Sequence, residues 1–238
     1  MKLSRCSEVH DQINHEICGF LKRSKNLDKK AKLLDVGCWN GITTHSYVES
    51  LGINEGYGIE YYEDKTFEAK HKGIIATQLN IETDEFPYED DCFDYVVCNQ
   101  VFEHLKLIYK PFDEISRVLK PGGLLIFSVP NLASFHNRLM LLWGVQPSSI
   151  RVFGPHVRGF TLEEFKKFSV FGDKLTIEKV IGVGFYPFPT ATLGKIMAKV
   201  WKNACHTPIV ILKKNSCVDS EIVSHENYMA SKFQTVFE

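Results

Sequence analysis

The sequence lacks several features that would assign it at once to a class of protein. Its seven cysteines are an odd number and form no C-x-x-C pair, which argues against a disulfide framework and a structural zinc site. The formal net charge is only −1, so the chain offers no general attraction to nucleic acid. Proline, glycine or charge interrupts each apolar run before it is long enough to span a bilayer.

What remains is an ordinary globular composition. The chain has 238 residues, of which 44% are hydrophobic and 24% charged, enough for one large domain with a substantial core. Cysteines without a disulfide pattern favour a reducing compartment, and we expect a cytoplasmic location. We also expect no stable insertion into a membrane.

Strand and helix patterns alternate along the first half of the chain. Strands are predicted at residues 32–36, 56–60, 73–78, 92–99 and 124–129, with two closing strands at 175–184 and 208–213. Helices are predicted at residues 4–24, 42–51, 63–71, 111–119 and 161–169. Alternation at this spacing predicts an α/β fold, a doubly wound and mostly parallel sheet with helices on both faces.

We expect one domain over residues 1–214 and a loosely held tail over residues 215–238. Residues 1–30 contain an amphipathic helix, which could cover the sheet or close over a ligand. Residues 131–160 leave the edge of the sheet without a scaffold role, and we expect them to form a substrate lid. The apolar part of that lid, residues 132–143, could also lie against a lipid, so peripheral lipid contact is expected as an option.

A glycine turn follows the first predicted strand and carries most of the functional argument. Gly37 and Gly41 allow backbone N–H groups to approach a ligand closely, and Asp35 precedes them. Glu60 ends the second strand about twenty residues later, a position from which a carboxylate accepts hydrogen bonds from both hydroxyls of a ribose. We therefore expect a ligand with an adenosine-type ribose.

The turn does not fit a nicotinamide dinucleotide well. Its glycine spacing is G-x-x-x-G rather than G-x-G-x-x-G, and the bulky Trp39 stands where a pyrophosphate needs close backbone approach. Asp35 is badly placed beside phosphates but well placed beside an ammonium or sulfonium group. A nicotinamide oxidoreductase is thus disfavoured.

Four stretches together resemble the class I S-adenosylmethionine-dependent methyltransferases, in particular the quinone-biosynthesis branch that acts on small molecules. They are residues 33–41 (LLDVGCWNG), 57–60 (YGIE), 91–99 (DCFDYVVCN) with 102–105 (FEHL), and 119–123 (LKPGG). The resemblance covers residues 30–130 and implies a seven-stranded Rossmann-like sheet whose last strand is antiparallel. It implies S-adenosyl-L-methionine as the cofactor.

The resemblance also implies roles for individual residues. The cofactor would be held by Asp35, Gly37, Cys38, Trp39, Gly41, Glu60, Tyr61, Asn80, Ile81 and Asn99. Among these, Asn80 and Ile81 would flank the adenine and Asn99 would line the path to the methyl group. Asn80 could equally be a turn residue at the end of a strand.

His104 and His156 are the candidates for a catalytic base, or else are hydrogen-bonded structural histidines. Some relatives hold a divalent metal with a Glu-x-x-Glu-His cluster, but Gln100 replaces the first acid here and we predict no metal. The predicted function is methyl transfer to a small-molecule acceptor (a metabolite, lipid or glycan) by in-line displacement. The alternative is a cofactor-binding accessory module that acts on a partner protein.

Overall fold

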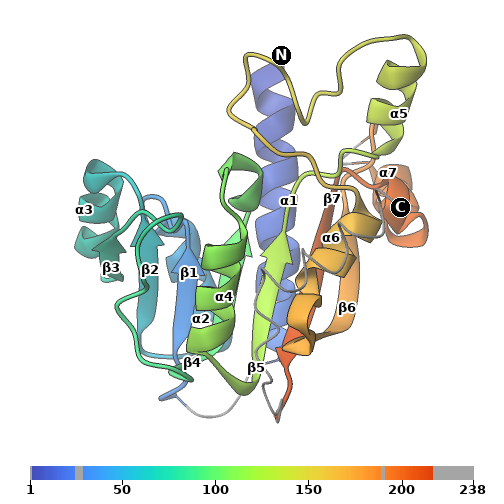
Figure 1. Cartoon of the computed structure of the whole chain (residues 1–238). Helices are drawn as coiled ribbons and strands as arrows, with labels where there is room; N and C mark the ends of the chain where they lie inside the picture. The colour runs from blue at the N-terminus through green and yellow to red at the C-terminus, as the bar shows by residue number, and fades with distance from the viewer. Residues whose placement is uncertain (1, 25–28, 189–190, 217–238) are drawn as a thin grey trace, which may run out of the picture.

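A seven-stranded sheet forms the centre of the computed structural model, which describes residues 2–24, 29–188 and 191–216. The strand order is β3-β2-β1-β4-β5-β7-β6 (Figure 1). The strands are β1 (Leu33–Val36), β2 (Gly56–Glu60), β3 (Ile75–Gln78), β4 (Phe93–Asn99), β5 (Leu119–Ser128), β6 (Leu175–Val183) and β7 (Thr207–Lys214). β1 to β5 pair in parallel, and β7 lies antiparallel between β5 and β6. The predicted fold class is confirmed, whereas most of the predicted tail, residues 217–238, lies outside the described residues.

Helices cover both faces of the sheet (Figure 1). They are α1 (Lys2–Arg23), α2 (Ile42–Leu51), α3 (Glu63–His71), α4 (Tyr109–Val118), α5 (Phe135–Leu142), α6 (Leu162–Ser169) and α7 (Thr192–Val200). Single 3₁₀ turns are η1 (Phe102–His104), η2 (Phe171–Asp173) and η3 (Lys202–Ala204).

Two hydrophobic layers form because successive side chains of a strand point to opposite faces. In β1, Leu34 belongs to the layer that contains Phe112 of α4 and Phe165 of α6, whereas Leu33 belongs to the layer under α1 and α2. The four residues of β1 are all buried, as in the central strand of a parallel sheet covered on both sides.

The N-terminal helix covers the sheet, as one of its two predicted roles required. Val9, Ile13, Ile17 and Leu21 recur at four-residue spacing and are buried in the layer that α2 shares. The helix therefore presents one apolar stripe to the sheet.

Two elements differ from the prediction. Pairing between β4 and β5 begins at Leu119, shifts register and resumes at Leu124, so residues 120–123 form an irregularity within β5 rather than a stop before it. Helix α7 lies between the two closing strands, where the sequence predicted only a proline-rich break.

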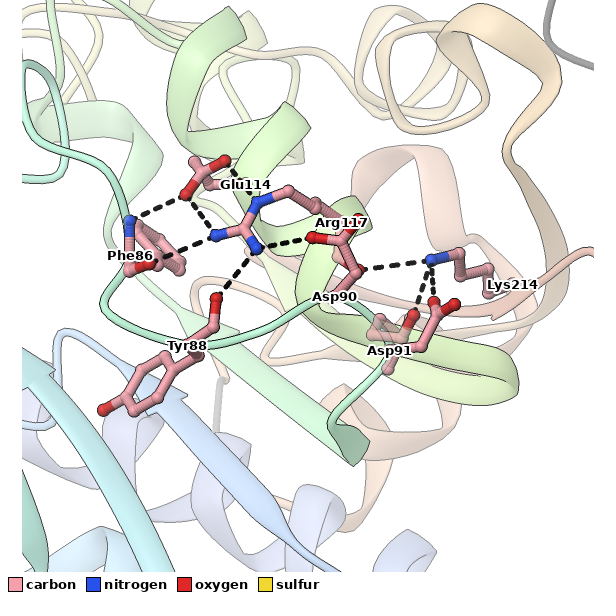
Figure 2. Close-up of polar contacts among 8 residues, drawn as sticks. Phe86, Tyr88, Asp90, Asp91, Glu114, Arg117 and Lys214 are labelled. Atoms are coloured by element: carbon pink, nitrogen blue, oxygen red, sulfur yellow. Dashed lines mark hydrogen bonds and ion pairs between the residues drawn. The ribbon is translucent and has the colours of Figure 1, made fainter.

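A polar network fixes the segment that leads into β4 (Figure 2). The Arg117 guanidinium donates bidentate hydrogen bonds to the Glu114 carboxylate at 2.7 and 2.8 Å. It also donates to the carbonyls of Phe86 and Tyr88. Glu114 also accepts from the Phe86 N–H at 2.7 Å. Because Arg–carboxylate contacts of this kind are rigid, the network anchors the amino end of β4, opposite the edge that carries the predicted site.

Candidate active site at the carboxyl edge of the sheet

The predicted ligand-binding residues lie where the strand order reverses. β1 pairs with β2 on one side and with β4 on the other, so Val36 lies opposite Ile59 and Cys98 in the parallel register. Glu60 is the last residue of β2 and Asn99 the last of β4. Ligands of doubly wound folds bind outside the carboxyl ends of the strands at such a switch point.

The glycine turn between β1 and α2 is held against the end of β2. The N–H groups of Gly37 and Cys38 both donate to the Ile59 carbonyl, at 2.8 and 3.1 Å. Gly37 has a φ of 80° and Gly41 a φ of 77°, values that a residue with a Cβ adopts only with strain. These glycines therefore set the path of the turn.

Glu60 is tied into the same turn through both carboxylate oxygens. Its Oε2 accepts from the Trp39 N–H at 2.9 Å, and its Oε1 accepts from the N–H groups of Tyr61 and Tyr62 at 2.9 and 3.1 Å. A carboxylate has about four acceptor positions, so one remains, on Oε2. Glu60 can hold one ribose hydroxyl in this arrangement, and a second hydroxyl would have to replace a backbone donor.

Asp35 lies within β1 and is buried. Its Oδ2 accepts a hydrogen bond of 2.6 Å from the Thr44 hydroxyl of α2. Burial raises the pKa of Asp35 from 3.8 to about 7, and the nearby charge of Glu60 raises it further against the lowering effect of Thr44. A cation close to Asp35 would offset this cost. Thr44 escaped the sequence analysis, although it stands in the first turn of the helix that follows the glycines.

Two other residues predicted to contact the ligand, Cys38 and Ile81, have buried side chains. The Cys38 thiol packs in a small cluster with Ala69, Ile74 and Ala76, and burial raises its pKa well above the ordinary range. Ile81 is buried in the main core. A ligand at the edge would therefore meet little of either side chain.

The aromatic and amide groups around the turn remain accessible. The Trp39 ring is half exposed, lies edge-on to Tyr62 and has the Lys65 ammonium 5.3 Å from its centroid. Tyr61 is exposed. The Asn80 Oδ1 accepts from the Glu82 N–H at 3.1 Å, which is the turn role weighed for this residue.

Asn99 joins three elements at the end of β4. Its amide nitrogen donates to Asn14 of α1 at 3.1 Å, and its carbonyl oxygen accepts from the Ser128 hydroxyl of β5 at 2.5 Å. The Tyr47 hydroxyl of α2 also donates to Asn14, at 3.1 Å. The N-terminal helix is thereby fastened at the edge that carries the predicted site, in addition to covering the sheet. The sequence offered no signal for Asn14, because the pairing spans 85 residues.

The two predicted histidines are brought together by the loop that contains His156. The backbone N–H groups of Val157 and Arg158 donate to the Glu103 carbonyl of η1, so this loop folds back onto the turn that follows β4. The rings of His104 and His156 then lie 4.8 Å apart between centroids.

Hydrogen bonds to carbonyls fix the tautomer of both rings. The Nδ1 of His104 lies 3.2 Å from the Pro155 carbonyl oxygen, and that of His156 lies 2.8 Å from the Ser149 carbonyl oxygen. Because a carbonyl can only accept, Nδ1 carries the proton and Nε2 of the neutral ring is left with a lone pair. Burial lowers the pKa of His104 below 6.5, which keeps this ring neutral near pH 7. Both rings can therefore act as bases through Nε2.

Glu103 is a buried acid that the sequence analysis did not include among the site residues. Burial raises its pKa to about 8, and its Oε2 is buried without a hydrogen-bond partner. Ligand-type atoms of Glu103, His104 and His156 lie within 4.8 Å of one another. Gln100, whose identity led to the prediction of no metal, donates to the Ser128 hydroxyl at 3.3 Å. That prediction is untested.

A family model described as a methyltransferase domain matches residues 9–168. The chain belongs to this methyltransferase family. The match includes the glycine turn, Glu60 and both histidine-bearing segments, and it confirms the resemblance on which the sequence analysis relied.

Relatives of this methyltransferase-family chain include two proteins named as O-methyltransferases. A malonyl-[acyl-carrier protein] O-methyltransferase of Coxiella burnetii is 30% identical over 133 residues, which cover 53% of this chain and 52% of the relative. A ubiquinone biosynthesis O-methyltransferase of Histophilus somni is 26% identical over 127 residues, covering 50% and 53%. The chain thus spans about half the length of the curated relatives it matches.

A solved structure agrees in fold over nearly the whole chain. It is a Thermotoga maritima protein described as an S-adenosylmethionine-dependent methyltransferase, possible histamine N-methyltransferase. Its TM-score is 0.62 at 18% identity, and the match covers 90% of this chain and 95% of the other.

The residues at the edge fit S-adenosylmethionine. Glu60 has an acceptor position for a ribose hydroxyl, and the buried Asp35 suits a group with a positive charge. Within the described residues, no lysine or arginine side chain contacts the carboxylate of Asp35 or Glu60. A phosphate-bearing ligand would therefore fit this edge less well than S-adenosylmethionine.

Proposed function

We propose that this chain binds S-adenosyl-L-methionine at the carboxyl edge of β1, β2 and β4 and transfers its methyl group to a small-molecule acceptor. The bound cofactor would supply a methyl group that is already activated on a sulfonium. Asp35, Gly37, Cys38, Trp39, Gly41, Glu60, Tyr61, Asn80, Ile81 and Asn99 are the residues proposed to contact it.

One observation carries this proposal. Two carboxylates, Asp35 and Glu60, are buried on neighbouring parallel strands and flank a turn of left-handed glycines. Burial of two acids without a basic partner costs desolvation free energy. A ligand that combines a hydroxyl donor with a positive charge offsets this cost. The family membership supports the same ligand.

His104 and His156 are proposed as bases for an acceptor that must lose a proton. Each presents Nε2 with a lone pair, and the loop that carries His156 returns to η1, the turn that follows β4. Such a loop would exclude water around the acceptor. A base contributes roughly 10²- to 10⁴-fold to a rate when proton loss accompanies the reaction.

Release of S-adenosylhomocysteine from a panel of metabolites, lipids and glycans tests the activity. A methyltransferase should release it above the blank with at least one acceptor class, and the release should fall in a Glu60→Ala variant. If the cofactor binds and no acceptor class supports release, the accessory-module alternative replaces the proposed transfer. Binding of a partner protein would then be the activity to measure.

A further inference from the structure

An exposed apolar row runs along α7, away from the site described above. Leu193, Ile196 and Val200 follow one another at three- and four-residue spacing and are all exposed. The buried side of the same helix carries Gly194 and Ala198. Leu193, Ile196 and Val200 therefore face away from the core, whereas Met197 packs against it, so most of the apolar surface of α7 is turned outward, the reverse of the usual arrangement.

The exposed end of α5 adjoins this row (Figure 1). The Arg138 guanidinium lies 5.7 Å from the centroid of the Trp201 ring and donates to the Asn203 carbonyl at 2.9 Å, so α5 lies beside the end of α7. Leu142, one turn beyond Arg138, is 77% exposed, and the adjacent Trp143 is 71% exposed. We define the apolar face as Leu141, Leu142, Trp143, Leu193, Ile196, Val200 and Trp201.

Every charged side chain on these elements is basic. Lys195 and Lys199 flank the apolar row on α7, Lys202 follows on η3, and Arg138 is the charged residue of α5. The sequence contains no acidic residue at positions 115–162 or 179–218, although the whole chain has a net charge of −1. In the described part of the chain, none of the three lysines pairs with a carboxylate.

We propose that the apolar face is a docking surface for a lipid bilayer that carries anionic headgroups. Aliphatic side chains can enter the boundary between headgroups and acyl chains, tryptophan favours that boundary, and lysine ammonium groups reach the anionic layer. Contact would be peripheral, because no helix among the described residues is long and apolar enough to cross a membrane.

The charge and composition of the face favour this occupant over others. Two copies of the chain meeting through this face would bring like charges together, which disfavours a symmetric dimer. Leucine, isoleucine and valine have no π surface on which a nucleic-acid base could stack. The inference does not depend on the proposed methyl transfer, because docking requires neither cofactor nor acceptor.

Vesicle co-sedimentation of the full chain tests the proposal. The probes are vesicles of phosphatidylcholine alone and vesicles that also contain phosphatidylglycerol. We expect binding to the second kind only, and weaker binding as the Debye length falls from about 8 Å at physiological salt to about 3 Å at 1 M. Each lysine near an anionic surface strengthens binding about fivefold, so Lys195→Glu with Lys199→Glu should weaken it by about 25-fold or more.

A second variant removes the apolar contribution and leaves the charges. Leu193→Ser, Ile196→Ser and Val200→Ser together should weaken binding by about tenfold or more, because the remaining helix has little apolar surface to bury. Phe67→Ser and Lys70→Glu are matched controls on α3, beside the opposite edge strand, and should bind like the parent chain.

The outcomes decide the proposal. Loss of binding in both face variants, with the controls unchanged, supports it. Absence of binding to anionic vesicles, equal binding to both kinds of vesicle, or unchanged binding of the charge-reversed variant overturns it. A dimer in sedimentation velocity that the triple variant abolishes would assign the face to a second copy instead. Should the triple variant misfold, the charge-reversed variant alone decides.

Discussion

Replacing Asp35 with asparagine should stabilise the ligand-free chain at alkaline pH and weaken cofactor binding. The fold raises the pKa of Asp35 from 3.8 to about 7, chiefly through burial. A raised pKa means that the folded chain holds a proton which the unfolded chain releases, so this carboxyl costs stability as pH rises from about 4 to about 7. At 1.36 kcal/mol per pKa unit the cost reaches about 4 kcal/mol as an order of magnitude.

Asparagine keeps the shape of the side chain and can still accept from the Thr44 hydroxyl, but it does not ionise. The unfolding free energies of the parent and Asp35→Asn chains, from urea titrations at a series of pH values, should therefore be similar near pH 4. The variant should become the more stable above pH 7. Asp113→Asn, at an exposed ion pair with Lys174, is the control and should shift stability by less than about 1 kcal/mol.

S-adenosylmethionine should reverse the order of stability of the parent and Asp35→Asn chains. The cofactor should raise the melting temperature of the parent chain, because a ligand stabilises the state that binds it, and should raise that of Asp35→Asn much less. A variant that is no more stable than the parent at pH 8, or that gains as much from the cofactor, would refute the assignment of Asp35 as a buried partner of a cation.

Three further predictions follow from the site. Glu60→Gln would place an amide N–H₂ beside backbone N–H groups, so we expect a loss of about 1–3 kcal/mol in urea unfolding and at least about tenfold weaker cofactor binding by calorimetry. His104→Ala and His156→Ala should each lower turnover, and full turnover in both variants would rule out both proposed bases. In the His156→Ala chain His104 is the remaining base, and its pKa is lowered, so kcat/KM should fall with acid only below pH 6.5. A chelator should leave turnover unchanged, and restoration of a chelator-sensitive rate by a divalent cation would show that the prediction of no metal is wrong.

Local pattern was sufficient for much of the fold. The helix Ile42–Leu51, the strand Gly56–Glu60 and the helix Glu63–His71 match their predicted bounds, because glycine turns and acidic or polar segments mark their ends. Helix α7 was missed because its buried side carries Gly194 and Ala198, residues too small to register as a core stripe. A Cβ at Gly194 would lie 1.7 Å from the Phe188 carbonyl oxygen, so the close approach depends on glycine.

The site was predictable to the extent that strand ends meet at one edge of a parallel sheet. That rule placed Asp35, Glu60 and Asn99 together from their positions alone. It could not show that the Glu103 side chain is buried, because Glu103 is contacted by a loop that returns from more than fifty residues away in the chain. Nor could it show that the acceptor positions of Glu60 are largely occupied by backbone N–H groups, since this depends on the path of the turn.

Calorimetric titration of the chain with S-adenosylmethionine, with NAD as the competing ligand, tests the account most directly. We predict saturable heat with S-adenosylmethionine that is lost in Glu60→Ala, and no heat with NAD. Heat with NAD alone, or S-adenosylmethionine binding that survives the loss of Glu60 unchanged, would contradict the central claim that paired buried carboxylates hold a sulfonium nucleoside at this edge.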